Sequence, residues 1–206
     1  VPPDYFSADG QLWGNPIYNW EDMKKDNYSW FNRRIKINLE LFDILRIDHF
    51  RGFSSFYEIP FGMTNARIGK WVKGPGMDFF HDKTELPIVA EDLGTLDEGV
   101  YQLLRESTYP GMKVLQFAFD GDYNNPHKPS NSGENYFCYT GTHDNMPFRG
   151  YLEELDYNKL NTLKNDVRIQ CERFGVDFRA DTIRDLVLTI DTLCYASPCK
   201  GAVIPL

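Results

Sequence analysis

The chain has 206 residues, which suits one domain or part of a larger one, because α/β barrels commonly need about 250 residues as a single unit. Apolar residues make up 42% and charged residues 25%, a mix typical of soluble globular proteins that argues against general disorder. The net charge of −8, without a cluster of Lys and Arg, excludes the basic surface that nucleic acids need but is compatible with a neutral substrate.

The first 42 residues are predicted to form a loop and then a helix. Glycine, asparagine and proline punctuate residues 1–27, and no hydrophobic period persists there. Ser29 is a candidate N-cap for a helix that continues to about Phe42. The apolar positions of this helix approximate a helical stripe: Trp30, Phe31, Ile35, Leu39 and Phe42.

Five short apolar runs predict buried strands, most of them separated by helical patterns. The runs cover residues 44–50, 86–90, 112–119, 136–140 and 201–206. Helical patterns cover residues 96–106, about 151–175 and 180–197. This alternation indicates parallel β/α units, although the link from the third to the fourth run looks like a loop rich in Asn, Pro and Ser. A barrel and an open doubly wound sheet both fit the pattern.

Three acidic residues follow predicted strands: Asp48, Glu91 and Asp144. In a parallel barrel they would converge on one pocket, where a pair of carboxylates can cleave a glycosidic bond. Such acids also commonly cap helices or pair with arginine. Strand alternation puts Arg46 on the same face as Asp48, and His49 and His143 adjoin two of the acids as candidate donors to sugar hydroxyls.

At these residues the chain resembles a known family. Residues 46–53 (RIDHFRGF) closely resemble the nucleophile segment of amylomaltases, glycoside hydrolase family 77, and residues 90–94 (AEDLG) and 139–145 (YTGTHDN) resemble its other two acidic segments. Residues 1–7 and 10–16 resemble the family's active-site loop, and residues 71–76 and 110–117 also fit. Seven motifs in family order cover nearly the whole chain.

The resemblance implies a (β/α)8 TIM barrel of the α-amylase clan, here incomplete, with residues 1–206 forming a single catalytic-barrel fragment of about strands 4 to 8. The N-terminal part of the barrel and its insertions would be absent, in keeping with a chain that opens without an initiating Met. The implied activity is that of a 4-α-glucanotransferase, which transfers α-1,4-glucan segments to another glucan or to glucose with retention.

The resemblance also implies a role for each site residue. Asp48 would be the nucleophile, Glu91 the acid/base and Asp144 the transition-state stabiliser. The residues implied to bind substrate are Arg46, His49, His143, Asp4, Tyr5, Trp13 and Asn15. Trp13 is a candidate platform for the acceptor sugar. The implied partners are α-1,4-glucans and maltooligosaccharides.

Three alternatives remain open at the level of sequence. A hydrolase of the same clan would use the same three acids with water as the acceptor. A non-catalytic glucan-binding module would use the aromatic residues but leave the acids without a role, and the truncated chain alone could be inactive. Residues 146–148 (Met-Pro-Phe) differ from the stretch expected after the third acid, which predicts a changed pocket rim.

Cofactors, metals and membranes are not expected. The four cysteines, Cys138, Cys171, Cys194 and Cys199, lack CxxC spacing and a paired His motif, so a zinc site is not predicted. Asp120 and Asp122 fail the calcium-loop pattern and predict a surface turn. Reduced thiols, with no signal peptide and no apolar run of transmembrane length, predict a cytoplasmic protein.

Overall fold

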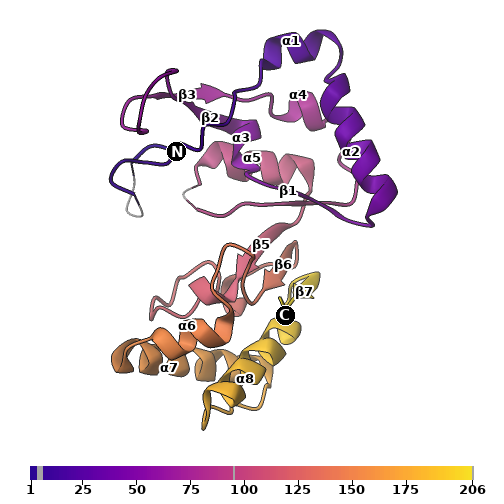
Figure 1. The fold of residues 1–206 in the computed structure, drawn as a ribbon. Coiled ribbons are helices and arrows are strands. Elements are labelled where there is room, and N and C mark those ends of the chain that lie inside the picture. Colours follow the sequence, from indigo (N-terminus) through magenta and orange to yellow (C-terminus); the bar gives the residue numbers. More distant parts are fainter. Residues whose placement is uncertain (4–6, 95, 206) are drawn as a thin grey trace. The chain divides into compact units, whose positions relative to one another are not determined.

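The computed structural model describes residues 1–3, 7–94 and 96–205, and it divides into two compact units. Unit 1 comprises Val1–Tyr109 and unit 2 comprises Pro110–Leu206. Figure 1 shows unit 1 in indigo to pink and unit 2 in pink to yellow. Each unit has its own hydrophobic core, so each is described by itself.

Unit 1 combines a parallel strand pair, an antiparallel hairpin and short helices. Its elements in chain order are α1 (Trp20–Lys25), α2 (Ser29–Leu41), β1 (Leu45–Ile47), α3 (Arg51–Ser54), β2 (Ser55–Glu58), β3 (Lys70–Lys73), α4 (Met77–Phe80), β4 (Ile88–Ala90) and α5 (Glu98–Ser107). Strands β1 and β4 pair in parallel, and β2 and β3 pair antiparallel. The two predicted strands of this unit are therefore confirmed as parallel neighbours.

The predicted N-terminal loop was wrong in one place, because it contains helix α1. The side chain of Asn19 caps this six-residue helix by accepting from the backbone N–H of Asp22. The helix is too short to show a hydrophobic period, and Trp20 anchors it by stacking on Phe31, with ring centroids 5.3 Å apart.

Helix α2 begins where the sequence predicts, but Ser29 is its first residue and not its N-cap. The N-cap is Tyr28, whose backbone is left-handed with φ of 56°. Asp26 accepts hydrogen bonds from both the backbone N–H and the hydroxyl of Ser29. The serine hydroxyl thus donates to a carboxylate and does not cap the helix.

The hairpin β2–β3 and helix α4 escape prediction from the hydrophobic pattern. Both strands have four residues, and the intervening residues 59–69 contain no two-residue turn signal. Gly74 lets the end of the hairpin approach the chain behind it, because a Cβ there would lie 2.3 Å from the carbonyl oxygen of Phe53. The Gly74 N–H donates to the carbonyl of Ser54 at 2.9 Å.

A phenylalanine-rich core packs α3 and α4 against β1 and β4. Phe50, Phe79 and Phe80 are fully buried, and Phe53 nearly so. The ring of Phe53 stacks on that of Phe79 at 5.5 Å. Burial of these large rings supplies much of the favourable free energy of this unit. It also holds the turn after β1, which begins at Asp48, in a fixed position.

Unit 2 is a three-stranded parallel sheet with three helices. Its elements are β5 (Gly111–Val114), η1 (Leu115–Phe117), η2 (Pro129–Asn131), β6 (Tyr136–Tyr139), α6 (Phe148–Glu154), α7 (Tyr157–Phe174), α8 (Ile183–Ala196) and β7 (Gly201–Val203). The strand order is β5-β6-β7, and every pairing is parallel. In Figure 1 the three helices lie on one side of the sheet.

Two predicted elements of unit 2 need correction. The apolar run 112–119 is strand only to Val114 and then tightens into the 3₁₀ turn η1. The helical pattern 151–175 is two helices, because the chain is extended at Leu155 and Asp156 caps α7 by accepting from the N–H of Lys159. The link from β5 to β6 contains only the short 3₁₀ turns η1 and η2 and no α-helix, so the loop-like link predicted there is confirmed.

The fold class is confirmed as α/β with parallel strand pairs. Five strands correspond to the five predicted runs, namely β1, β4, β5, β6 and β7. They lie in two sheets, one in each unit. Closure into a barrel stays a prediction.

Candidate active site

The ends of β1 and β4 bring Asp48 and Glu91 to the same edge of the sheet. The register pairs Leu45 with Ile88 and Ile47 with Ala90, so the residues that follow are Asp48 and Glu91. The ladder reaches the second of these, because the N–H of Glu91 donates to the carbonyl of Ile47 at 2.9 Å. Residues 43 positions apart in sequence are thus neighbours at the carboxyl end of a parallel pair.

Asp48 carries an ion pair with Arg46, as strand alternation predicts. The guanidinium Nη2 of Arg46 lies 2.7 Å from Oδ1 of Asp48. Asp48 is 79% exposed on its side chain, whereas that of Arg46 is 27% exposed. The carboxylate therefore faces open space, while a largely covered cation holds it from behind.

Glu91 is held by backbone N–H groups. Its Oε2 accepts from the N–H of His49 at 2.7 Å, and its Oε1 accepts from the N–H of Leu93 at 2.8 Å. The carbonyl of Glu91 accepts from the N–H of Phe50 at 3.1 Å. The carboxyl group that the sequence predicts as acid/base is therefore positioned by the turn that follows Asp48.

His49 takes the strained backbone conformation that this contact requires. Its φ is 47°, in the left-handed region that non-glycine residues rarely adopt. Its ring lies against Gly52, where an added Cβ would approach Cδ2 to 3.2 Å. Burial by the surrounding protein lowers the pKa of His49, opposed by the charge of Glu91. A neutral imidazole, able to donate from one nitrogen and accept at the other, therefore prevails at pH 7.

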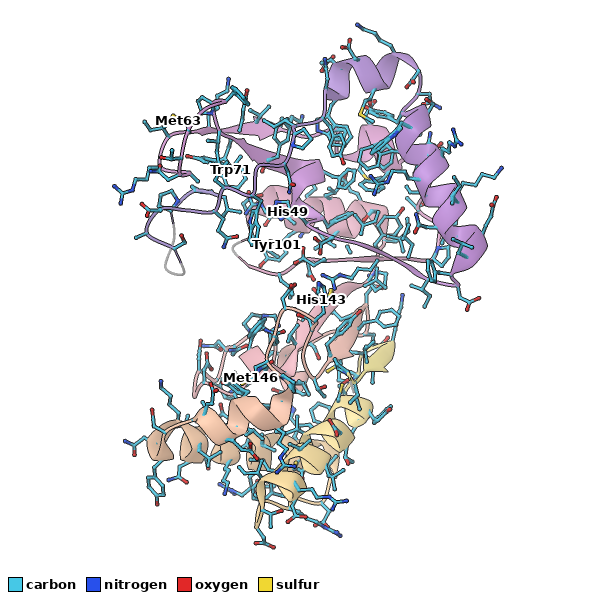
Figure 2. The ribbon with its side chains drawn as sticks, in the orientation of Figure 1. His49, Met63, Trp71, Tyr101, His143 and Met146 are labelled. Atoms are coloured by element: carbon cyan, nitrogen blue, oxygen red, sulfur yellow. The ribbon has the colours of Figure 1, made fainter. Side chains whose placement is uncertain are left out.

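A cavity of about 710 Å³ opens beside Asp48. Arg46, Asp48 and His49 line it on one side, with Trp13 of the N-terminal loop and Trp71 of β3 among its aromatic walls. Glu91 is not among the lining residues, although the N–H that its Oε2 accepts from belongs to His49, which is. Figure 2 labels His49 and Trp71 in unit 1.

Asp144 lies in unit 2, in a tight turn that follows β6. Oδ1 of Asn145 accepts from both the N–H and the hydroxyl of Thr142, at 2.9 and 2.8 Å. The N–H of Asp144 donates to that hydroxyl at 3.3 Å. The side chains of His143 and Asp144 are 72% and 75% exposed, with Nε2 and Oδ1 3.4 Å apart.

Two independent comparisons agree on the family. A sequence model of glycoside hydrolase family 77, described as 4-alpha-glucanotransferase, matches residues 1–206. The chain belongs to this family. It is 50% identical over 156 residues to the 4-alpha-glucanotransferase of Clostridium butyricum, covering 74% of this chain and 32% of the relative.

More distant relatives extend the similarity to the whole chain. The chloroplastic/amyloplastic 4-alpha-glucanotransferase of Arabidopsis thaliana is 39% identical over 210 residues, covering 100% of this chain and 34% of the relative. A solved amylomaltase from Streptococcus agalactiae, in complex with acarbose, matches with a TM-score of 0.85 and 37% identity over 99% of this chain and 40% of that one. The chain spans about a third of the length of the curated relatives it matches.

Of the four loop residues that the family resemblance predicts to bind substrate, the structure describes two. Asp4 and Tyr5 lie outside the described residues. Trp13 and Asn15 line the cavity, and Trp13 is 76% exposed with its Nε1 donating to Oε1 of Gln11 at 3.1 Å. An exposed indole at a cavity rim is available for contact with a sugar ring.

Two residues at or next to the cavity, Trp71 and Arg51, were not singled out by the sequence. Trp71 lines the cavity with its ring under the guanidinium of Arg51, whose Cζ is 4.2 Å from the ring centroid. Both belong to segments that resemble the family, 71–76 and 46–53. The resemblance marks these segments, but residue type alone does not separate a cavity wall from ordinary packing.

The described part of the chain shows no metal-binding cluster, no disulfide and no membrane-spanning helix. Within residues 1–3, 7–94 and 96–205, no group of three or more His, Cys, Asp or Glu side chains could hold a metal ion. All four cysteines are free thiols, three of them buried. Among the same residues, no helix combines the length and apolar character needed to span a bilayer.

Proposed function

We propose that this chain supplies the catalytic centre of a 4-α-glucanotransferase that transfers α-1,4-glucan segments by retaining double displacement. The observation that carries the proposal is the pairing of β1 with β4, which sets Asp48 and Glu91 at one strand edge beside an aromatic-walled cavity. Membership of the 4-alpha-glucanotransferase family supports it.

Asp48 is the nucleophile in this proposal. Its exposed carboxylate attacks the anomeric carbon of a bound glucan, and the glycosidic C–O bond breaks as the Asp48 ester forms. Arg46, at 2.7 Å, orients the attacking carboxylate and leaves its outer face free. The departing glucan segment takes its proton from Glu91.

Glu91 then reverses its role. The 4-hydroxyl of a second glucan enters, Glu91 removes its proton, and the Asp48 ester is displaced. Two inversions restore the α-configuration. For a retaining pair the two carboxyl groups are expected about 5–5.5 Å apart. The N–H groups of His49 and Leu93 fix one side of this geometry.

Asp144 is the proposed stabiliser of the oxocarbenium-like transition state. Its exposed carboxylate, beside His143, is available to bind ring hydroxyls. His49 and Trp13 would contact the substrate from unit 1, with Trp13 as the acceptor platform. The amylomaltase of S. agalactiae was solved with acarbose, which supports α-glucan-like ligands for this chain.

The proposed fold is the second part of a (β/α)8 barrel of the α-amylase clan. Strands β1, β4, β5, β6 and β7 would be barrel strands 4 to 8, and β2–β3 a hairpin inserted after strand 4. The likeness to the S. agalactiae amylomaltase supports a shared fold over 99% of this chain. Four free thiols support a reducing compartment such as the cytoplasm.

The test compares Asp48→Asn with Asp43→Asn in the complete enzyme that contains this chain. Asp43 is an exposed acid just before β1 and serves as the matched control. Asp48→Asn is expected to lower glucan transfer by on the order of 10⁴-fold or more while glucan binding stays measurable. Full activity in Asp48→Asn would remove this residue from the nucleophile role.

Product analysis on maltotriose separates transfer from hydrolysis. Transfer gives a ladder of longer and shorter oligosaccharides, whereas hydrolysis gives only shorter products. A ladder is the expected result, and its absence would favour the hydrolase alternative.

A further inference from the structure

Arg51 joins the turn after Asp48 to the segment that carries Glu91. Its Nη2 lies 2.9 Å from Oδ2 of Asp97, and its side chain is only 12% exposed. Asp97 is the N-cap of α5, where its other carboxylate oxygen accepts from the N–H of Val100. A covered guanidinium therefore contacts the carboxylate that begins the helix after Glu91.

This contact is the third in a series made by consecutive residues. The N–H of His49 donates to Oε2 of Glu91, the N–H of Phe50 donates to the carbonyl of Glu91, and the guanidinium of Arg51 donates to Asp97. The first two contacts hold the start of the Glu91 segment. The third contact holds Asp97, the N-cap of α5, which lies six residues after Glu91.

The indole of Trp71 fixes the orientation of the guanidinium. Cζ of Arg51 lies 4.2 Å from the ring centroid, and the ring of Tyr57 meets Trp71 edge-on at 5.4 Å. A planar guanidinium can stack on a ring and donate to a carboxylate at once, which a lysine ammonium cannot do with the same geometry.

We propose that Arg51 is a positioning residue for the acid/base step, acting through Asp97 on the segment that holds Glu91. The inference rests on the proposed function, since it assigns Arg51 to the geometry of that same site. Without the guanidinium, Asp97 loses the side-chain contact that links the start of α5 to the turn after Asp48, and the Glu91 carboxyl group would sample positions less suited to proton transfer.

The experiment uses the complete enzyme and two pairs of substrates. With maltotriose as donor and acceptor, both chemical steps need Glu91. With α-maltosyl fluoride and azide, neither does: fluoride leaves from carbon without a proton as the Asp48 ester forms, and azide then forms a C–N bond as the Asp48 carboxylate leaves. A defect in Glu91 positioning therefore affects only the first pair.

Arg51→Gln is expected to lower kcat for maltotriose by roughly 10- to 100-fold while the fluoride and azide reaction stays within about 3-fold of wild type. The kcat of Arg51→Lys for maltotriose should lie between those of Arg51→Gln and wild type, because lysine keeps the charge but cannot stack on Trp71 as the planar guanidinium does. Asp97→Asn should resemble Arg51→Gln, since asparagine keeps the N-cap oxygen and removes the charge.

Arg105→Gln is the matched control. It breaks an exposed ion pair with Glu98 on the same helix and should leave both reactions unchanged. An equal loss in both reactions for Arg51→Gln and Asp97→Asn, or no loss in either, would overturn the positioning role. Glu91→Ala tests the underlying function separately: if it keeps wild-type transfer on maltotriose, the proposed chemistry fails whatever Arg51 does.

Discussion

The two units present their strand-end acids in different ways. In unit 1, Glu91 accepts from the N–H of His49, 42 residues earlier in the chain, and from the N–H of Leu93, while a largely covered Arg46 pairs with Asp48. In unit 2, a local turn built by Thr142 and Asn145 presents Asp144 with its side chain in the open. One long-range contact thus ties the proposed acid/base to the turn after the proposed nucleophile, whereas the hydrogen bonds described around Asp144 lie within its own turn.

After Asp48→Asn, the largest expected effect comes from removing the charge of Asp144 in unit 2. Asp144→Asn should lower kcat by about 10²- to 10³-fold with a much smaller change in KM, because in the proposed mechanism the carboxylate stabilises charge that develops only in the transition state. Steady-state kinetics of the complete enzyme on maltotriose measures this. Glu154→Gln, an exposed acid on α6, is the control. A rise in KM alone would make Asp144 a ground-state binding residue.

The next effect concerns the stability of unit 2 at low pH. Nδ1 of His127 accepts from the N–H of Val114, and burial, with Lys113 nearby, lowers its pKa to about 4 against a partly opposing Asp120. Between pH 6.5 and about pH 4 the unfolded chain binds a proton at His127 that the folded unit does not bind. The contribution of the neutral imidazole to folding stability is therefore complete above pH 6.5 and is lost as the pH falls to about 4. The loss is on the order of 3 kcal/mol.

His127→Asn tests this pH dependence. Asparagine can keep an acceptor near the position of Nδ1 but does not titrate in this range. Hydrogen exchange of the β5 and β6 amides, corrected for intrinsic rates, should show a smaller fall in opening free energy between pH 7 and pH 4.5 in the variant. Equal falls in variant and wild type would show that other groups carry the pH dependence.

A smaller effect should follow from loosening the Asp144 turn. Asn145→Ala removes the acceptor shared by the Thr142 N–H and hydroxyl, which should cost about 1–2 kcal/mol of local stability and lower kcat by roughly 10-fold. Asn145→Asp keeps an acceptor oxygen and should retain more activity than alanine. If both variants match wild type in kcat, the turn does not position Asp144.

The smallest effect isolates the strained backbone at His49. Both His49→Gly and His49→Ala lose the imidazole, but only glycine adopts φ of 47° without strain. His49→Gly should therefore be more stable than His49→Ala by about 1 kcal/mol, measured by urea unfolding of the complete enzyme. Equal stabilities would mean that the strain is relieved elsewhere.

The sequence predicts the parallel strands and their terminal acids well, because apolar runs and strand alternation report local geometry directly. Arg46 meeting Asp48 is one such result. Helix α1 and the hairpin β2–β3 were missed because a six-residue helix and four-residue strands are too short to show a period.

The contacts of Glu91 could not be predicted for another reason. They depend on backbone N–H groups at His49 and Leu93, which every residue type except proline supplies, and on a left-handed φ that histidine does not favour. The cation–π contact of Arg51 with Trp71 likewise joins residues twenty positions apart through tertiary packing. Motif resemblance marks such segments without giving their geometry.

Trapping the covalent intermediate tests most directly whether Asp48 and Glu91 act on one sugar linkage. In the complete enzyme, Glu91→Ala should still react with α-maltotriosyl fluoride, because fluoride leaves without a proton, and should then accumulate an ester for lack of a base. Mass spectrometry of the digested protein should find the maltotriosyl adduct on the peptide that contains Asp48. An adduct on a different residue, or continued turnover of maltotriose with no adduct, would contradict the assignment of these two carboxylates.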